Sequence, residues 1–174
     1  MGLRFCMKKS NIILIGMAGA GKSTTGVVVA KILAKDFLDG DLVIQKQTGR
    51  LLQDIIDMEG NDGFRRIEEA VLCGIDVENT VIAPGGSAIY YPAAFDHFKE
   101  HGVVVYLHVP VEEIERRLSN LATRGVTLEP GQTVADLYYQ RLPLYQKYAD
   151  ITIDTTGLTL EDTVAEIVKA VEEV

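Results

Sequence analysis

Residues 11 to 33 read NIILIGMAGAGKSTTGVVVAKIL, and three kinds of local pattern follow one another within this stretch. The apolar run Asn11–Gly16 is typical of a buried strand. The segment Gly16–Ser23 then matches the complete pattern G-x-x-x-x-G-K-S/T. A helix is expected next, over about residues 22 to 35. Strand, glycine-rich loop and helix, in that order, are the context in which this pattern forms a phosphate-binding loop.

This loop predicts that the chain binds a nucleoside triphosphate. Its glycines allow backbone N–H groups to converge on phosphate oxygens, and the helix N-terminus adds partial positive charge. Lys22 would reach the β- and γ-phosphates, and the Ser23 hydroxyl would bind Mg²⁺. The alternative is a glycine-rich turn that binds nothing. The loop residues expected to hold ATP are Gly19, Ala20, Gly21, Lys22, Ser23 and Thr24.

Length and composition favour one globular domain. The chain has 174 residues, of which 47% are hydrophobic and 24% charged. We expect no signal peptide and no membrane span, because no apolar run approaches the roughly 20 residues that a span needs. The net charge of −8 disfavours binding to nucleic acid or anionic membranes. Two cysteines, Cys6 and Cys73, and three histidines without ligand spacing predict a reduced, cytoplasmic protein without a metal site of its own.

Apolar runs rich in β-formers alternate with helical stretches along the whole chain. This alternation predicts an α/β fold with a parallel sheet covered by helices on both faces. Active sites in such sheets lie at the carboxyl ends of the strands. The strands are expected at Asn11–Gly16, Phe37–Asp39, Val81–Ala83, Val103–His108 and Ile151–Asp154, and the helices at about 22–35, 41–48, 51–58, 63–78, 92–100, 111–121, 133–149 and 160–172.

The stretch from residue 120 to residue 133 differs from the rest, because it is polar and contains Gly125, Pro130 and Gly131. It indicates a long mobile loop, and such loops are often lids that exclude water during phosphoryl transfer. Arg124 lies in this segment and could stabilise charge on the γ-phosphate. Pro143, inside the following helical pattern, predicts a kink or a break in that helix.

Two carboxylates, Asp39 and Asp41, stand at the end of the second expected strand. We assign Asp39 to the water ligands of Mg²⁺ and Asp41 to the hydroxyl that accepts the phosphoryl group. The alternative interpretation of Asp41 is a helix N-cap.

Two further segments could bind an acceptor molecule. Arg65 and Glu68 share one helix face, so Glu68 could hold Arg65 against a substrate carboxylate. The alternative is an exposed ion pair of little energetic weight. The glycine pair Gly85-Gly86 follows a strand and would let backbone approach a ligand closely, or would simply form a tight turn. Arg141 lies on the helix after the polar loop.

Taken in order, these motifs resemble the shikimate kinase family over nearly the whole chain. The matching segments are the phosphate-binding loop, residues 37–41 (FLDGD), 63–68 (GFRRIE), 81–86 (VIAPGG) and 141–145 (RLPLY), and Ala149-Asp150. The resemblance implies a fold like that of the nucleoside monophosphate kinases, with five parallel strands in the order 2-3-1-4-5. It also implies transfer of the ATP γ-phosphate to the 3-hydroxyl of shikimate, on the pathway to chorismate and aromatic amino acids.

The resemblance also implies individual roles. Asp41 would bind the acceptor hydroxyls, Arg65 and Arg141 would clamp the carboxylate, and the Gly86 backbone would lie nearby. Arg124 resembles the lid arginine, and Arg117 the arginine that stacks on adenine. The whole chain, 1–174, would form one P-loop kinase domain with its core at 10–174, its lid at about 120–133 and its substrate-binding helices at about 41–78. Mg²⁺ would accompany ATP, and a monomer is expected.

Three departures from the family pattern concern the acceptor. Ser87 replaces a third glycine, the segment after Arg124 reads Gly125-Val126-Thr127, and the polar loop carries Glu129-Pro130-Gly131-Gln132. A related kinase for another hydroxylated carboxylic acid, such as gluconate, is therefore the alternative function. A regulatory nucleotide-binding module without turnover is a second alternative.

Overall fold

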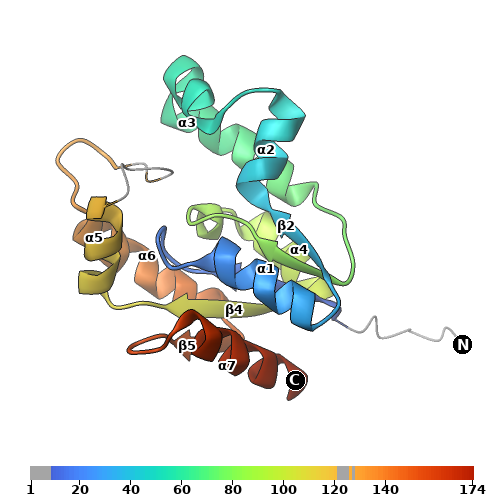
Figure 1. Ribbon diagram of the computed structural model, residues 1–174. Coiled ribbons are helices and arrows are strands. Elements are labelled where there is room, and N and C mark those ends of the chain that lie inside the picture. The colour runs from blue at the N-terminus through green and yellow to red at the C-terminus, as the bar shows by residue number, and fades with distance from the viewer. Residues whose placement is uncertain (1–8, 121–125, 127) are drawn as a thin grey trace, which may run out of the picture.

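A five-stranded parallel sheet forms the centre of the computed structural model, which describes residues 9–120, 126 and 128–174 (Figure 1). The strand order is β2-β3-β1-β4-β5, which confirms the α/β architecture and the order that the resemblance implied. The strands are β1 Asn11–Ile15, β2 Asp36–Asp39, β3 Thr80–Ala83, β4 Gly102–His108 and β5 Ile151–Asp154.

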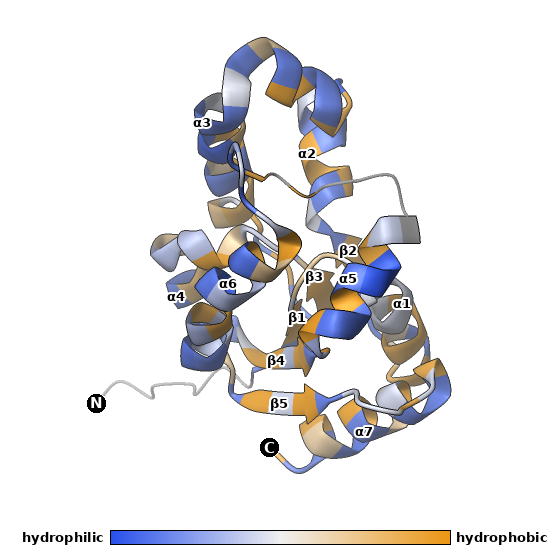
Figure 2. Cartoon of the chain, turned by 90° about the vertical axis from the view of Figure 1, so that its left-hand side faces the viewer, coloured by the Kyte–Doolittle hydropathy of each residue, from blue (hydrophilic) through white to orange (hydrophobic). Residues whose placement is uncertain are grey.

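Helices cover both faces of the sheet. α1 and α7 pack together on one face, whereas α4 and α6 lie on the other (Figure 2). α2 and the start of α3 project away from the sheet (Figure 1). The helices are α1 Lys22–Ile32, α2 Gly40–Thr48, α3 Leu52–Cys73, α4 Pro92–His101, α5 Val111–Asn120, α6 Val134–Tyr148 and α7 Leu160–Glu172, with a short 3₁₀ helix at Ala88–Tyr90.

The apolar composition of the central strands follows from their burial. All residues of β1 and β3 are buried, as is β4 apart from its last residue. Because helices cover both faces, side chains on either side of a strand meet apolar surroundings, so the strands read as continuous apolar runs. Asn11 is the polar exception within β1. Its Nδ2 donates to the Val77 carbonyl at 2.6 Å and its Oδ1 accepts from the Thr80 N–H at 3.0 Å, which ties β1 to the entry of β3.

α3 contains the interruption that the sequence predicted between two helices. Gly60 has φ 70° and ψ 177° within the span Leu52–Cys73, so the helical backbone is broken there. The helix then ends at Cys73, five residues before the predicted end. A separate small apolar cluster packs α2 against α3 and consists of Ile44, Ile55, Phe64 and Val71. The helices α2 and α3 therefore form their own packed unit beside the sheet.

Of the kink or break predicted at Pro143, the break is wrong, because α6 continues through this residue to Tyr148. Proline removes one backbone donor. The helix nevertheless remains continuous, because buried side chains recur on one of its faces every three or four residues. These residues are Tyr138, Arg141, Tyr145 and Tyr148.

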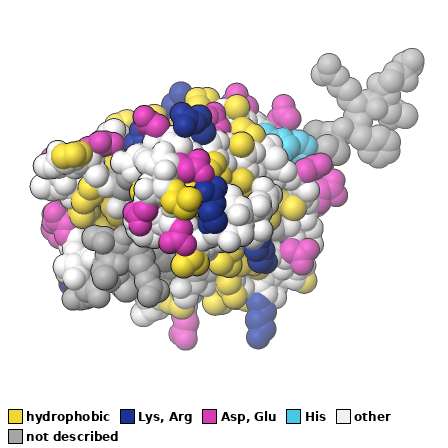
Figure 3. All heavy atoms as spheres, turned by 90° about the horizontal axis from the view of Figure 1, so that it is seen from above, with side chains coloured by type: hydrophobic (Ala, Val, Ile, Leu, Met, Phe, Trp, Pro, Cys, Tyr) yellow, Lys and Arg dark blue, Asp and Glu magenta, His cyan; other side chains and the backbone are white. Residues whose placement is uncertain are grey.

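The face of the molecule on the side of α2 and α3 is neither uniformly acidic nor uniformly basic. Acidic and basic side chains are interspersed there (Figure 3). Among the described residues, no helix has both the length and the apolar character needed to cross a bilayer.

Replacing Asn11 by alanine should lower the free energy of unfolding by about 2 kcal/mol, because the buried Thr80 N–H and the Val77 carbonyl lose their partner. Thermal and urea unfolding measure this change, and for a chain of this size the melting temperature should fall by about 4–8 °C. Gln47→Ala, at an exposed position of α2, is the control. Equal stability of the two variants would contradict the bridging role of Asn11.

Candidate functional site

The glycine-rich loop lies between β1 and α1, at the carboxyl end of the sheet. Gly21 has φ 87° and precedes α1, which begins without a side-chain cap and without an acidic residue in its first turn. The first N–H groups of α1 are therefore open to an anion. Lys22 is buried, and its Nζ donates to the carbonyls of Gly16 and Met17, both at 2.8 Å. Burial lowers the pKa of Lys22 to about 8, so its ammonium group remains charged at neutral pH.

Asp39 connects the loop to α2. Its Oδ2 accepts from the Ser23 hydroxyl at 2.6 Å, and its Oδ1 accepts from the N–H groups of Asp41 and Leu42 at 2.9 and 3.3 Å. The N-cap of α2 is therefore Asp39, and the alternative that placed Asp41 in this role is wrong. The hydroxyl of Ser23 and the carboxylate of Asp39 are hard oxygen donors beside the phosphate loop, so these residues fit Mg²⁺.

Asp41 faces the same space as the loop. A cavity of about 340 Å³ is lined by loop residues including Lys22 and Thr24, by Asp39 and Asp41, and by the glycine pair Gly85-Gly86. Burial, together with the nearby Asp39 and Glu68 carboxylates, raises the pKa of Asp41 to about 6, although Lys22 opposes this shift. A carboxylate with a pKa near neutrality is suited to accept a proton.

Arg141 is the most unusual cation of the site. It is 5% exposed, and its Nε has no hydrogen-bond partner among the described residues. Its guanidinium carbon lies 5.5 Å from the centre of the Tyr90 ring. A Cβ at Gly86 would lie 2.9 Å from Arg141 Nη1, so a side chain at this position would crowd the guanidinium group. Leaving a buried donor unpaired costs free energy, which indicates a site built for an anion.

The contacts of the described residues include no hydrogen bond or ion pair between Glu68 and Arg65, so the expectation that Glu68 holds Arg65 is wrong. Glu68 is 1% exposed and accepts from the Ser87 hydroxyl at 2.7 and 2.8 Å and from the Tyr91 hydroxyl at 2.6 Å. Burial raises the pKa of Glu68. Arg65 instead forms ion pairs with two other carboxylates. Its Nη2 lies 3.4 Å from Glu129 Oε1, and its Nη1 lies 3.9 Å from Asp62 Oδ1.

Two neighbouring cavities are both lined by Glu68 and Arg141. One, of about 550 Å³, is lined by Asp41, Gln45, Gly86 and apolar residues of α3. The other, of about 320 Å³, is lined by Arg65, Tyr90 and Glu129. They share four lining residues: Phe64, Glu68, Ser87 and Arg141. The structure thus brings Asp41, Arg65, Gly86 and Arg141 to adjoining walls, next to the loop. Sequence reasoning missed Phe64, Tyr90 and Tyr91, although the two tyrosines closely follow the glycine pair.

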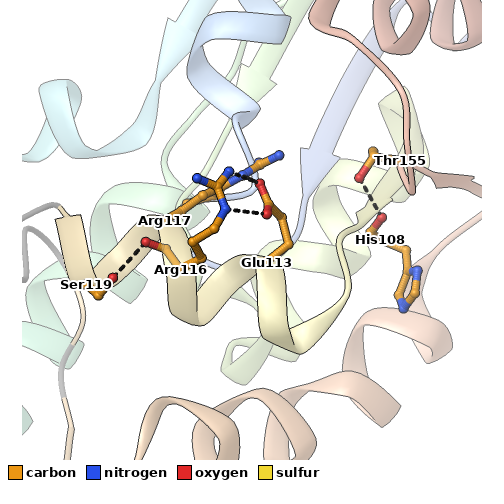
Figure 4. A network of polar contacts seen from close by, with 7 residues as sticks. His108, Glu113, Arg116, Arg117, Ser119 and Thr155 are labelled. Carbon is orange, nitrogen blue, oxygen red and sulfur yellow. Dashed lines mark hydrogen bonds and ion pairs between the residues drawn. The ribbon is translucent and has the colours of Figure 1, made fainter.

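Arg117 lies on the other side of the loop. Its Nη1 donates to the Gly19 carbonyl at 2.9 Å. Its Nε donates to the Glu113 carboxylate at 2.7 Å (Figure 4). Glu113 also accepts from Arg116, and these hydrogen bonds lower its pKa to about 2. A cavity of about 430 Å³ runs from Pro110 past Arg117 to residues 155–158.

The expected lid lies partly outside the described residues. Arg124 falls there, together with the rest of 121–125 and residue 127. Within the described part, Glu129–Gln132 form a turn that precedes α6.

Comparison with known proteins places the chain in a family. The family model that matches residues 18–172 is described as shikimate kinase. Shikimate kinase from Thiobacillus denitrificans is 39% identical over 152 residues, or 85% of this chain and 82% of the relative. The Vibrio vulnificus enzyme of that name is 36% identical over 169 residues, or 95% and 98% of the two chains.

A solved structure gives the same result at the level of the fold. Shikimate kinase from Acinetobacter baumannii, in complex with shikimate, matches with a TM-score of 0.84 and 35% identity, covering 96% of this chain and 95% of the other. With sequence and structure in agreement over nearly the full length, the chain belongs to the shikimate kinase family.

Proposed function

We propose that this protein transfers the γ-phosphate of ATP to the 3-hydroxyl of shikimate, a step toward chorismate and aromatic amino acids. The observation that carries the proposal is the buried Arg141, which lies beside the Gly86 backbone and whose Nε has no hydrogen-bond partner in the described part of the chain. An acid bound there would project its ring toward Asp41, whose cavity continues to Lys22. Family membership and the shikimate complex of the Acinetobacter baumannii relative support the same acceptor.

ATP would bind along the phosphate loop. The N–H groups at the start of α1 and the Lys22 ammonium would hold the β- and γ-phosphates. Adenine would lie beside Arg117, in the cavity that includes residues 155–158. Ser23 and Asp39 would hold Mg²⁺, which neutralises developing charge on phosphate oxygens when bound. From the sequence, Arg124 remains proposed as the lid residue that contacts the γ-phosphate.

Asp41 would orient the acceptor hydroxyl and accept its proton. With a pKa of about 6, Asp41 is mostly ionised at neutral pH and is still basic enough to take the proton as the new bond forms. Arg141 would bind the carboxylate through a two-pronged contact, with Arg65 and the Gly86 N–H beside it.

We also propose that the whole chain works as one kinase domain. Its core would span 10–174, its acceptor side the helices within about 41–78, and its lid about 120–133. A monomer remains the expectation.

The direct test is ADP release with ATP, Mg²⁺ and single hydroxy acids, including shikimate and gluconate. Release that depends on shikimate is the expected result. ADP release with gluconate only would assign the chain to another acceptor. If none of the acids caused ADP release, the proposed reaction would be contradicted.

Asp41→Asn should lower kcat about tenfold or more, because the acceptor hydroxyl loses its base while Mg·ATP still binds. In the parent protein, kcat/KM should fall as the pH drops below about 6, since protonated Asp41 cannot accept a proton. Asp36→Asn, at the opposite end of β2, is the matched control and should retain activity. An acid limb that persists unchanged in Asp41→Asn would assign the base elsewhere.

Arg141→Ala should raise the KM for shikimate about tenfold to a hundredfold, because charge-assisted hydrogen bonds to the carboxylate are lost. The KM for ATP should change little, since Arg141 does not line the loop cavity. Arg66→Ala, an exposed arginine of α3, serves as the control. Steady-state kinetics measure the split, with circular dichroism to check folding. A similar rise in both KM values would argue against a role confined to the acid.

A further inference from the structure

Arg65 already has a carboxylate partner within the chain. Its Nη2 lies 3.4 Å from Glu129 Oε1, a contact between residues 64 positions apart. Both side chains line the 320 Å³ cavity that also reaches Ser87 and Arg141. The guanidinium group proposed to receive the acceptor's carboxylate is therefore in contact with a carboxylate of the protein.

Local hydrogen bonds hold the backbone of Glu129 in position. The Gln132 N–H donates to the Glu129 carbonyl at 2.9 Å, and the Gln132 side-chain oxygen accepts from the Glu129 N–H at 3.1 Å. Gln132 Nε2 then donates to Gln140 Oε1 at 2.9 Å. Gln140 immediately precedes Arg141 on α6. The turn that carries Glu129 is thus tied to the helix that carries the buried arginine.

From this arrangement we propose that Glu129 is a specificity-determining residue that competes with the acceptor's carboxylate for Arg65. The inference rests on the proposed function, because it concerns the same acid-binding wall. A bound acid must displace Glu129 to use the Arg65 fork, because both carboxylates need the same guanidinium donors. Acids that also bind Arg141 and Asp41 gain enough binding free energy to displace Glu129 from Arg65. Simple carboxylates that reach only Arg65 do not.

The size of the effect follows from exposure. The Arg65 and Glu129 side chains are 45% and 58% exposed, so solvent screens their attraction. Removing the competitor should therefore tighten acid binding by only about two- to fivefold.

Glu129→Gln tests the proposal, because it keeps the shape of the side chain and removes its charge. The KM for shikimate should fall about two- to fivefold, while kcat and the KM for ATP change by less than about twofold. In an Arg65→Ala background, the same change should leave the KM for shikimate unaltered, because the competition has no target.

Asp62→Asn is the matched control. Asp62 also approaches Arg65, at 3.9 Å, but its side chain is 88% exposed and does not line the cavity. Its KM for shikimate should equal that of the parent. An unchanged or higher KM in Glu129→Gln, or an equal fall in the Arg65→Ala background, would overturn the competition. Absence of shikimate turnover in the parent protein would instead overturn the proposed function, and this inference with it.

Discussion

Parallel pairing of β2, β3 and β1 is the constraint on which the site depends. The register aligns Leu38 with Ile82 and Ile13 with Ile82, so the three strands end at one edge of the sheet. At that edge the chain continues into the phosphate loop, the Asp39–Asp41 segment and the glycine pair. Gly40 meets Pro84 so closely that a Cβ there would lie 2.6 Å from the Pro84 carbonyl oxygen. Sequence segments far apart are thereby forced to share one small volume.

Charge balance in this volume explains why the individual groups are perturbed. Lys22 and Arg141 are buried cations, and Glu68 is a buried anion beside the half-buried Asp41. Burial alone disfavours each charge, and the opposite charges nearby offset part of that cost. The result is a lysine with a lowered pKa and an aspartate with a raised one. Within residues 9–120, 126 and 128–174, the Nε donor of Arg141 has no hydrogen-bond partner, and a bound carboxylate would satisfy it. Perturbed groups gathered in one cavity are typical of a functional site.

Local patterns in the sequence predicted the parts of the molecule that local physics determines. The buried strands, the loop before α1 and the interruption near Gly60 follow from apolar runs and glycine positions. The order of the strands came from the resemblance, since periodicity does not specify which strands become neighbours. The break expected at Pro143 does not occur, because core contacts along the same helix outweigh the propensity of one residue.

The partners of Glu68 show where sequence reasoning stops. Spacing correctly put Arg65 and Glu68 on one helix, but it could not reveal which neighbours the tertiary fold would supply. Ser87 and Tyr91 reach Glu68 from 19 and 23 residues further along the chain. The contact between Arg65 and Glu129 spans an even longer separation. The capping role of Asp39 is different, because it is local: its carboxylate accepts from N–H groups two and three residues further along the chain.

The central claim is that the phosphate loop and the acid-binding wall serve one continuous reaction space. A crystal structure with ADP, Mg²⁺ and shikimate measures this most directly. The account predicts ADP on the loop, a shikimate carboxylate oxygen about 3 Å from the Arg141 guanidinium, and a shikimate hydroxyl about 3 Å from Asp41. Shikimate bound away from Arg141, or in a cavity separated from the nucleotide by protein, would contradict it.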